Sequence, residues 1–192
     1  MTASQHNPAQ SFSPHSLGNK IARALWGCAY VLLFRLSPRP LHGWRNLVLR
    51  CFGAKLHSTA RVYPKATIWH PGRLTMGAHS CIADNVDVYN VGGVTIGAHA
   101  VVSQYTYLCG ATHDHEHVEF PLIPKPIVIG NRTWVAADCF VAAGVTIGEG
   151  SVVGARSHVF KDLPEWSICV GSPARAIKPR GLGPSDFGET TA

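Results

Sequence analysis

The chain has 192 residues, of which 46% are hydrophobic and 15% are charged, so it can bury one core but is too short for two large domains. Its 19 glycines and 13 prolines are more than a helical protein usually carries and favour a turn-rich β architecture. The net charge of +6 favours an anionic partner: nucleic acid, acidic lipid or a phosphorylated small molecule. Because the basic residues form no long run, nucleic acid is the weakest of the three.

Polar residues open the chain, and a helical segment follows them. Residues 1–16 are rich in Ser, Pro and Gln and predict a disordered N-terminus. The segment 17–55 is expected to be helical, with one helix over 17–36 and a second short helix over 41–56 that ends at Gly53.

The first of these helices has an apolar body between basic residues. Its run ALWGCAYVLLF, residues 24–34, is too short to cross a bilayer, which takes about 20 apolar residues. With Lys20, Arg23 and Arg35 beside this run, the helix could cover the end of the main fold, pack at a subunit contact or lie on a membrane surface. We favour the covering role and keep peripheral membrane contact through this helix as an alternative.

A period of six residues then runs through most of the chain. From Ile129 the blocks are IGNRTW, VAADCF, VAAGVT, IGEGSV, VGARSH and VFKDLP, each opened by an aliphatic residue, with a small residue second in five of the six. A period of six fits neither an amphipathic helix nor a two-sided strand, but it fits a short strand and a turn, repeated. It predicts an all-β solenoid over 56–170, a parallel β-helix in which three blocks make one triangular coil.

The repeat breaks at 113–128, which predicts a loop that protrudes from the coils. Three histidines stand at alternate positions in this loop: His113, His115 and His117. They could bind a metal, move protons or lie in a solvated loop. After the repeat we expect a closing segment at 171–180 and a disordered tail at 181–192.

The six cysteines include no C-x-x-C pair. This spacing argues against a zinc ribbon or a disulfide scaffold and favours reduced thiols in a cytoplasmic protein.

Two segments resemble the last coils and the closing segment of hexapeptide-repeat acyltransferases: VTIGEGSVVGARSHVFKDLPEWSICVGSPARAIKPR and IVIGNRTWVAADCFVAAGVTIG. Two more are similar to the branch of this family that serves colanic acid and related exopolysaccharide biosynthesis: NVDVYNVGGVTIGAHAVVSQYTYLCGATHDH and SPRPLHGWRNLVLRCFGAKL. The resemblance covers roughly residues 17–180. It implies a left-handed β-helix that forms a homotrimer, with active sites between subunits and acetyl-CoA bound along the side of the helix.

The resemblance also implies a catalytic residue. The sugar O-acetyltransferases of this family use a histidine at the start of the protruding loop as general base, and His113 matches that position. Imidazole titrates near neutrality and can take the proton of a sugar hydroxyl as its oxygen attacks the thioester carbonyl. A main-chain amide near Ala137 is the implied donor to the oxyanion. His115 and His117 match no motif of the family and are expected to lie in a solvated loop.

Co-substrate contacts are implied along the last coils. Trp134 matches an aromatic residue at the acyl-CoA or acceptor site, and Ala137 and Ala155 match small residues beside the pantetheine arm. The cations implied near the nucleotide end are Lys161, Arg175 and Lys178. Phe160 departs from the threonine common in galactoside-type relatives, which puts one polar co-substrate contact in doubt. On the acceptor side, the candidate contacts are Asn90 and Asp87.

Three other interpretations stay open. An amino sugar or an antibiotic as acceptor would need the same base. A zinc enzyme similar to the gamma-type carbonic anhydrases would need three ligands converging on one point, but the histidine spacing of that family is absent. A non-catalytic solenoid would have lost His113 and the basic closing residues, which this chain keeps.

The sequence therefore predicts an acetyl-CoA-dependent O-acetyltransferase that needs no metal and no nucleic acid. Its expected acceptor is a saccharide or lipid-linked saccharide, an exopolysaccharide precursor. Its expected location is the cytoplasm, including the inner face of the membrane.

Overall fold

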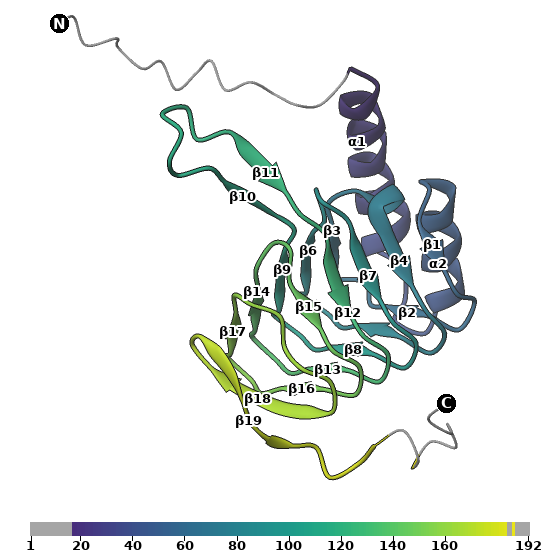
Figure 1. The fold of residues 1–192 in the computed structure, drawn as a ribbon. Coiled ribbons are helices and arrows are strands. Elements are labelled where there is room, and N and C mark those ends of the chain that lie inside the picture. The colour runs from purple at the N-terminus through teal and green to yellow at the C-terminus, as the bar shows by residue number, and fades with distance from the viewer. Residues whose placement is uncertain (1–16, 184–185, 187–192) are drawn as a thin grey trace, which may run out of the picture.

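Short parallel strands wind around a common axis and form the body of the molecule (Figure 1). The computed structural model describes residues 17–183 and 186, so the disorder expected for 1–16 and for most of 181–192 falls outside the described residues. Three sheets form the faces of a left-handed β-helix of about six turns, which confirms the fold predicted from the six-residue period.

The three faces are named here A, B and C. Face A consists, in spatial order, of β1 (Lys55–Leu56), β4 (Leu74–Met76), β7 (Val94–Ile96), β12 (Ile127–Ile129) and β15 (Thr146–Ile147). Face B consists of β2 (Arg61–Val62), β5 (Cys81–Ile82), β8 (Val101–Val102), β13 (Trp134–Val135), β16 (Val152–Val153), β18 (Ser167–Gly171) and β19 (Ala174–Pro179). Face C consists of β3 (Thr67–Ile68), β6 (Asp87–Tyr89), β9 (Tyr107–Cys109), β14 (Phe140–Val141) and β17 (His158–Val159).

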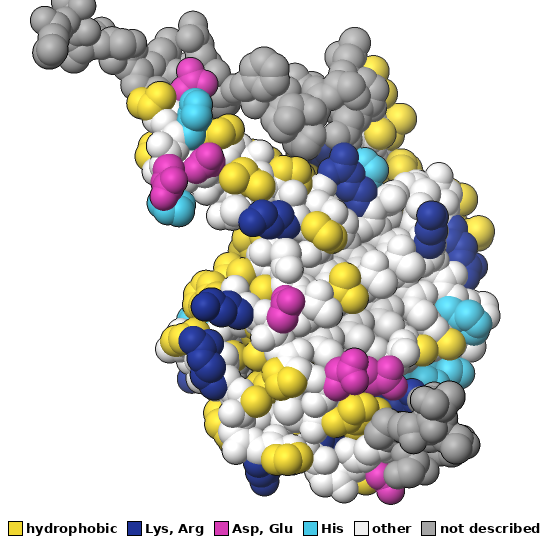
Figure 2. All heavy atoms as spheres, in the orientation of Figure 1, with side chains coloured by type: hydrophobic (Ala, Val, Ile, Leu, Met, Phe, Trp, Pro, Cys, Tyr) yellow, Lys and Arg dark blue, Asp and Glu magenta, His cyan; other side chains and the backbone are white. Residues whose placement is uncertain are grey.

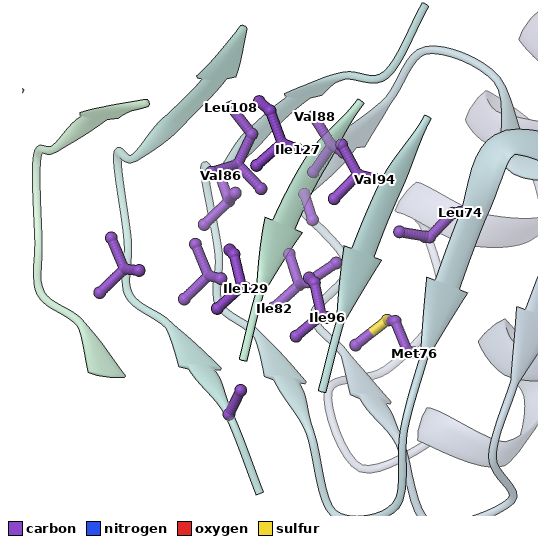
Figure 3. Close-up of a cluster of buried hydrophobic side chains, with 14 of the residues drawn as sticks. Leu74, Met76, Ile82, Val86, Val88, Val94, Ile96, Leu108, Ile127 and Ile129 are labelled. Atoms are coloured by element: carbon purple, nitrogen blue, oxygen red, sulfur yellow. The ribbon is translucent and has the colours of Figure 1, made fainter. Parts of the chain in front are cut away.

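The core is a set of aligned aliphatic columns inside the coils (Figure 3). Parallel register places the inward residue of each strand directly beside its counterpart one coil away, as for Met76, Ile96 and Ile129 on face A. All three are at most 2% exposed. The aliphatic residue that opens each six-residue block is therefore the residue that fills the core.

Small residues after the openers allow the coils to turn closely above one another. At Gly97, an added Cβ would lie 2.6 Å from the backbone nitrogen of Asn131 in the next coil, and at Gly130 it would lie 2.6 Å from the nitrogen of Glu149. No side chain fits at that distance, which explains the glycine in these blocks.

Helices cover the N-terminal end of the solenoid, as favoured from the sequence. They are α1 (Leu17–Ala29), which continues as the π-helical turn η2 (Tyr30–Arg35), and α2 (His42–Cys51); a short 3-10 turn, η3 (Pro71–Arg73), lies between the first two coils. The second helix, expected to end at Gly53, spans His42–Cys51, and Gly53 follows its C-cap residue Phe52 with φ +90°.

Some carbonyl groups of the first coil point toward the N-terminal end of the solenoid, where no preceding coil can donate hydrogen bonds to them. The helices supply side-chain donors instead. Arg45 donates from Nε to the Val62 carbonyl at 2.6 Å, and Asn46 donates to the Ala60 carbonyl at 2.7 Å. Trp26 donates from Nε1 to the Ile68 carbonyl at 2.7 Å. These bonds satisfy a sheet edge that would otherwise be unpaired.

Candidate active site

A β-hairpin stands away from the coils where face C turns into face A (Figure 1). Its strands are β10 (Ala111–His113) and β11 (Leu122–Pro124), which pair antiparallel with His113 opposite Leu122. The expected loop at 113–128 is thus largely this arm, which begins just after β9. The edge of the solenoid that carries the arm is called here the C–A edge.

His113 ends β10 with an exposed side chain and one ring nitrogen already bound. Its Nδ1 lies 2.5 Å from the carbonyl oxygen of Phe120 across the hairpin. A carbonyl oxygen can only accept, so Nδ1 must carry the hydrogen of the neutral ring. The lone pair is then on Nε2, which is the nitrogen available to take a proton from another molecule.

The other polar residues of the arm organise its turn. Asp114 accepts from the backbone nitrogen of Glu116 at 3.1 Å, and His117 Nδ1 accepts from that of Glu119 at 3.2 Å. His115 is exposed, as is His117. Across the described part of the chain, no group of three or more His, Cys, Asp or Glu side chains is placed to hold a metal ion.

Face B carries two of the predicted co-substrate residues, Trp134 and Lys178, in one row. Trp134 on β13 is 49% exposed, and its Nε1 donates to Ser103 Oγ at 2.9 Å. The register runs from Trp134 through Val152 and Ile168 to Lys178 on β19, so Lys178 and Trp134 share the outer side of the face. The solenoid thus brings together two residues that are far apart in the sequence.

Two free amide groups lie at the edge between faces B and C, called here the B–C edge. Ala137 follows β13 and Ala155 follows β16, each in the turn that leads to face C. Within the described residues, neither backbone N–H donates to an acceptor, whereas the Ala137 carbonyl accepts from Arg156 at 3.0 Å. Such N–H groups are available to a bound carbonyl or a developing oxyanion.

The three predicted cations are exposed. In the described ranges 17–183 and 186, Lys161, Arg175 and Lys178 have no carboxylate partner. Arg175 makes only a contact with the neighbouring Ala174 carbonyl, at 2.9 Å. Phe160, beside Lys161, is 54% exposed and offers no polar group.

The two predicted acceptor contacts differ in their surroundings. Asp87 lies at an outer position of β6 and is exposed as a residue. Surrounding atoms still partly desolvate its carboxyl group, which raises the pKa of that group. Asn90 is fully buried: its Oδ1 accepts from the His70 nitrogen at 3.0 Å, and its Nδ2 donates to the His70 carbonyl at 2.8 Å. Asn90 therefore braces two coils in this structure, in place of the acceptor contact expected for it, because its amide groups are already paired.

Aromatic residues that were not predicted lie beside Asp87 on face C. Trp69 and Tyr89 occupy equivalent positions one coil apart, with ring centroids 5.1 Å apart, and the Arg23 guanidinium of α1 lies 3.7 Å from the Trp69 ring. Tyr107 is the register neighbour of Asp87. The six-residue phase could have shown that Trp69 and Tyr89 align, but nothing in the sequence placed Arg23 over them.

Comparisons with known proteins agree with this geometry. Residues 126–161 match the family described as bacterial transferase hexapeptide (six repeats). The putative colanic acid biosynthesis acetyltransferase WcaF of Escherichia coli K12 is 47% identical over 163 residues, which cover 85% of this chain and 90% of that protein. The chain belongs to the hexapeptide-repeat acetyltransferases. The family and the enzyme class predicted from the sequence are thereby confirmed.

Solved structures of hexapeptide-repeat acetyltransferases share the fold. One from Vibrio cholerae, VCA0836, has a TM-score of 0.77 at 27% identity and covers 87% of this chain and 95% of its own. A galactoside acetyltransferase in complex with coenzyme A has a TM-score of 0.79 at 26% identity and covers 92% of this chain and 88% of its own.

Proposed function

We propose that this acetyltransferase moves an acetyl group from acetyl-CoA to a hydroxyl group of a saccharide, with Nε2 of His113 as the general base. The observation that carries the proposal is the bond from His113 Nδ1 to the Phe120 carbonyl, which leaves Nε2 free at the start of an exposed arm. Support for the donor comes from the relative solved with coenzyme A. Support for a saccharide comes from the relative named for colanic acid biosynthesis.

In the proposed reaction, Nε2 removes the hydroxyl proton while the sugar oxygen attacks the thioester carbonyl carbon. The negative charge that develops on the carbonyl oxygen is stabilised by the free N–H of Ala137. The carbon–sulfur bond then breaks, and the imidazolium returns its proton to the leaving CoA thiolate. No acyl-enzyme forms, so no cysteine is required.

We further propose that the active unit is a homotrimer, because one chain keeps the base and the donor residues apart. The His113 arm grows from the C–A edge, whereas Trp134 and Lys178 lie on face B, which this edge does not touch. Face C separates the C–A edge from the B–C edge, where Ala137 lies. Copies that pack their C faces around a three-fold axis bring the C–A edge of one copy to the B–C edge of the next.

Aromatic rings on face C support this packing. Phe140 contacts Tyr107 and Phe160 at centroid distances of 5.8 and 5.7 Å, and Phe160 is 54% exposed. Aromatic residues are enriched in buried protein interfaces. The proposed location is the cytoplasm, where acetyl-CoA is available and where the six free cysteines would stay reduced.

The test is His113→Ala, measured with acetyl-CoA and a panel of exopolysaccharide precursors. Loss of a general base should lower kcat by about 10²- to 10⁴-fold. The dissociation constant of CoA, measured by calorimetry, should stay the same because the donor residues are intact. A variant that keeps its kcat would rule out His113 as the base. His115→Ala is the matched control, since that side chain has no assigned role, and it should keep its kcat.

A further inference from the structure

The N-terminal helices keep a large apolar surface exposed after they have covered the solenoid. Along α1 and η2, Ile21, Leu25, Leu32 and Leu36 recur at helical spacing and are 45% or more exposed, with the exposed Cys28 between them. These positions follow an i, i+4, i+7, i+11, i+15 pattern, which places them on one side of the helix. The inward side of the same helix carries the buried Trp26 and Phe34.

α2 continues this surface. Its outward residues Trp44 and Leu47 are 42% and 52% exposed. Trp44 donates from Nε1 to the Leu33 carbonyl at 2.7 Å, so the apolar sides of η2 and α2 join. The combined surface, called here the helical patch, consists of Ile21, Leu25, Val31, Leu32, Leu33, Leu36, Leu41, Trp44 and Leu47. An exposed apolar surface of this extent usually marks an interaction site.

The charged residues of the N-terminal part of the chain are all basic, which favours an anionic partner for the helical patch. The first 83 residues contain ten Lys and Arg and no Asp or Glu, whereas residues 84–192 contain seven Lys and Arg and all 11 acidic residues. In Figure 2, acidic side chains lie on the hairpin and over the later coils, and hydrophobic side chains lie at the rim where the helices are. The helical patch thus belongs to a segment whose charged residues are all basic, although Asp84 from a later coil pairs with Arg39.

Two of these cations, Arg35 and Arg39, are exposed and can reach a surface that the patch contacts. Arg35 is exposed and is held by one bond, from Nη1 to Tyr30 Oη at 3.3 Å. Arg39 is 70% exposed at its side chain, although it pairs with Asp84 at 3.2 Å. Arg45 is different, because it is buried and bound to carbonyl groups. Long basic side chains beside an apolar helix face are typical of helices that lie in a membrane interface.

We propose that the helical patch docks this acetyltransferase on an anionic phospholipid bilayer, with α1, η2 and α2 lying in the plane of the interface. The leucines enter the acyl boundary, Trp44 lies at the headgroup level, and Arg35 contacts lipid phosphates. No helix of the described residues is long and apolar enough to cross the bilayer. The attachment proposed here is peripheral.

Docking would bring the acceptor side of the enzyme to the membrane, an inference that also rests on the proposed function. Arg23 of α1 lies over Trp69, and Trp26 donates a hydrogen bond to the Ile68 carbonyl. The docked helix therefore touches the coil that carries Trp69, the first residue of the aromatic pair Trp69 and Tyr89. A saccharide on a lipid carrier would then meet Trp69 and Tyr89 without leaving the surface.

The test is flotation of the full-length protein with vesicles of phosphatidylcholine alone or mixed equally with phosphatidylglycerol. We expect binding to the mixed vesicles that weakens as salt is raised. Leu32→Gln with Leu36→Gln should weaken binding about tenfold for each side chain, and Arg35→Gln about fivefold. Val118→Gln with Val128→Gln, exposed valines on the hairpin and face A, is the matched control and should bind as the unmodified chain does.

Three results would overturn the proposal. The protein could fail to float with the mixed vesicles, or float equally well with both kinds at every salt concentration. Alternatively, the Leu32→Gln, Leu36→Gln variant could float normally but sediment as a smaller species, which would place the patch between copies of the chain. Flotation needs no acetyl transfer, so it can fail while the His113 experiment succeeds, and the reverse.

Activity then tests the link to the acceptor. The Leu32→Gln, Leu36→Gln variant should lose kcat/KM on a vesicle-embedded saccharide and keep it on the water-soluble form. His113→Ala should lose activity on both. Equal activity of the patch variant on both substrates would separate docking from acceptor delivery and reject that link.

Discussion

The two nitrogens of His113 differ because of a residue seven positions away. The Phe120 carbonyl fixes the hydrogen on Nδ1 and holds the ring, so that the lone pair is on Nε2. A proton acceptor held in one orientation loses less conformational entropy when substrate binds. In His117, Nδ1 instead accepts a hydrogen bond from the backbone nitrogen of Glu119, so this ring stabilises the turn of the hairpin.

Asp87 gives a prediction that depends on pH. Burial raises the pKa of its carboxyl group, so folding favours the protonated form. The protonated carboxyl group therefore contributes its full stability below the ordinary pKa of Asp, and this contribution is lost as the pH rises through the raised pKa of the folded protein. At neutral pH the carboxylate is ionised, and its burial costs stability. Asp87→Asn should raise the midpoint of thermal unfolding at pH 7 by about 1–3 °C, a modest gain because the group is partly exposed and screened.

The comparison should be repeated in acid. Near pH 3, about one unit below the ordinary pKa of Asp, the difference between Asp87→Asn and the unmodified protein should nearly vanish. Asp138→Asn, which removes an exposed partner of Arg156, should change the free energy of unfolding by less than about 0.5 kcal/mol at either pH. A loss of stability in Asp87→Asn at neutral pH would contradict the argument and assign the carboxylate a stabilising role.

At the scale of elements, the helical cover depends on one buried cation. Arg45 is fully buried and donates to the carbonyl groups of Val62, Pro38 and Arg39 and to Ser37 Oγ. Burial lowers the pKa of its guanidinium group, but the bound carbonyl oxygens offset that cost. Arg45→Met should lower the free energy of unfolding by about 3 kcal/mol, because several carbonyl groups lose their donor at once.

Urea denaturation of the full chain measures this effect. Arg35→Met is the control, because its guanidinium is exposed and its loss should cost less than about 0.5 kcal/mol. Equal losses in the two variants would show that the cover is held by apolar packing alone.

The β-helix could be read from the sequence because each coil repeats the same local rule. An aliphatic residue such as Ile129 or Val135 opens each block and enters the core, so the period, the inward residues and the break at 113–128 followed from counting in sixes. The hairpin arm did not follow, because pairing His113 with Leu122 depends on two stretches without alternating polarity. The burial of Asn90 did not follow either, because only the fold places its amide groups against His70.

At the scale of the whole molecule, the candidate site is divided between edges of the solenoid. The proposed base, His113, lies at the C–A edge, the free amides lie at the B–C edge, and face C, with Phe140 and the exposed Phe160, lies between them. A heterologous contact repeated around a closed ring joins two different edges of neighbouring copies. Under this arrangement each site takes His113 from one copy and its donor residues from the next.

Two inactive variants should therefore restore each other. One copy carries His113→Ala with intact donor residues, and the other carries Arg175→Glu with Lys178→Glu and an intact His113. Each alone should be inactive, but in trimers that contain both chains about one site in three should combine an intact histidine with an intact neighbouring donor face. The measurement is the acetyl-transfer rate of mixed oligomers isolated through two different affinity tags. Mixed oligomers without activity would place the base and the donor residues of each site in the same chain, and the proposed arrangement of edges would have to be abandoned.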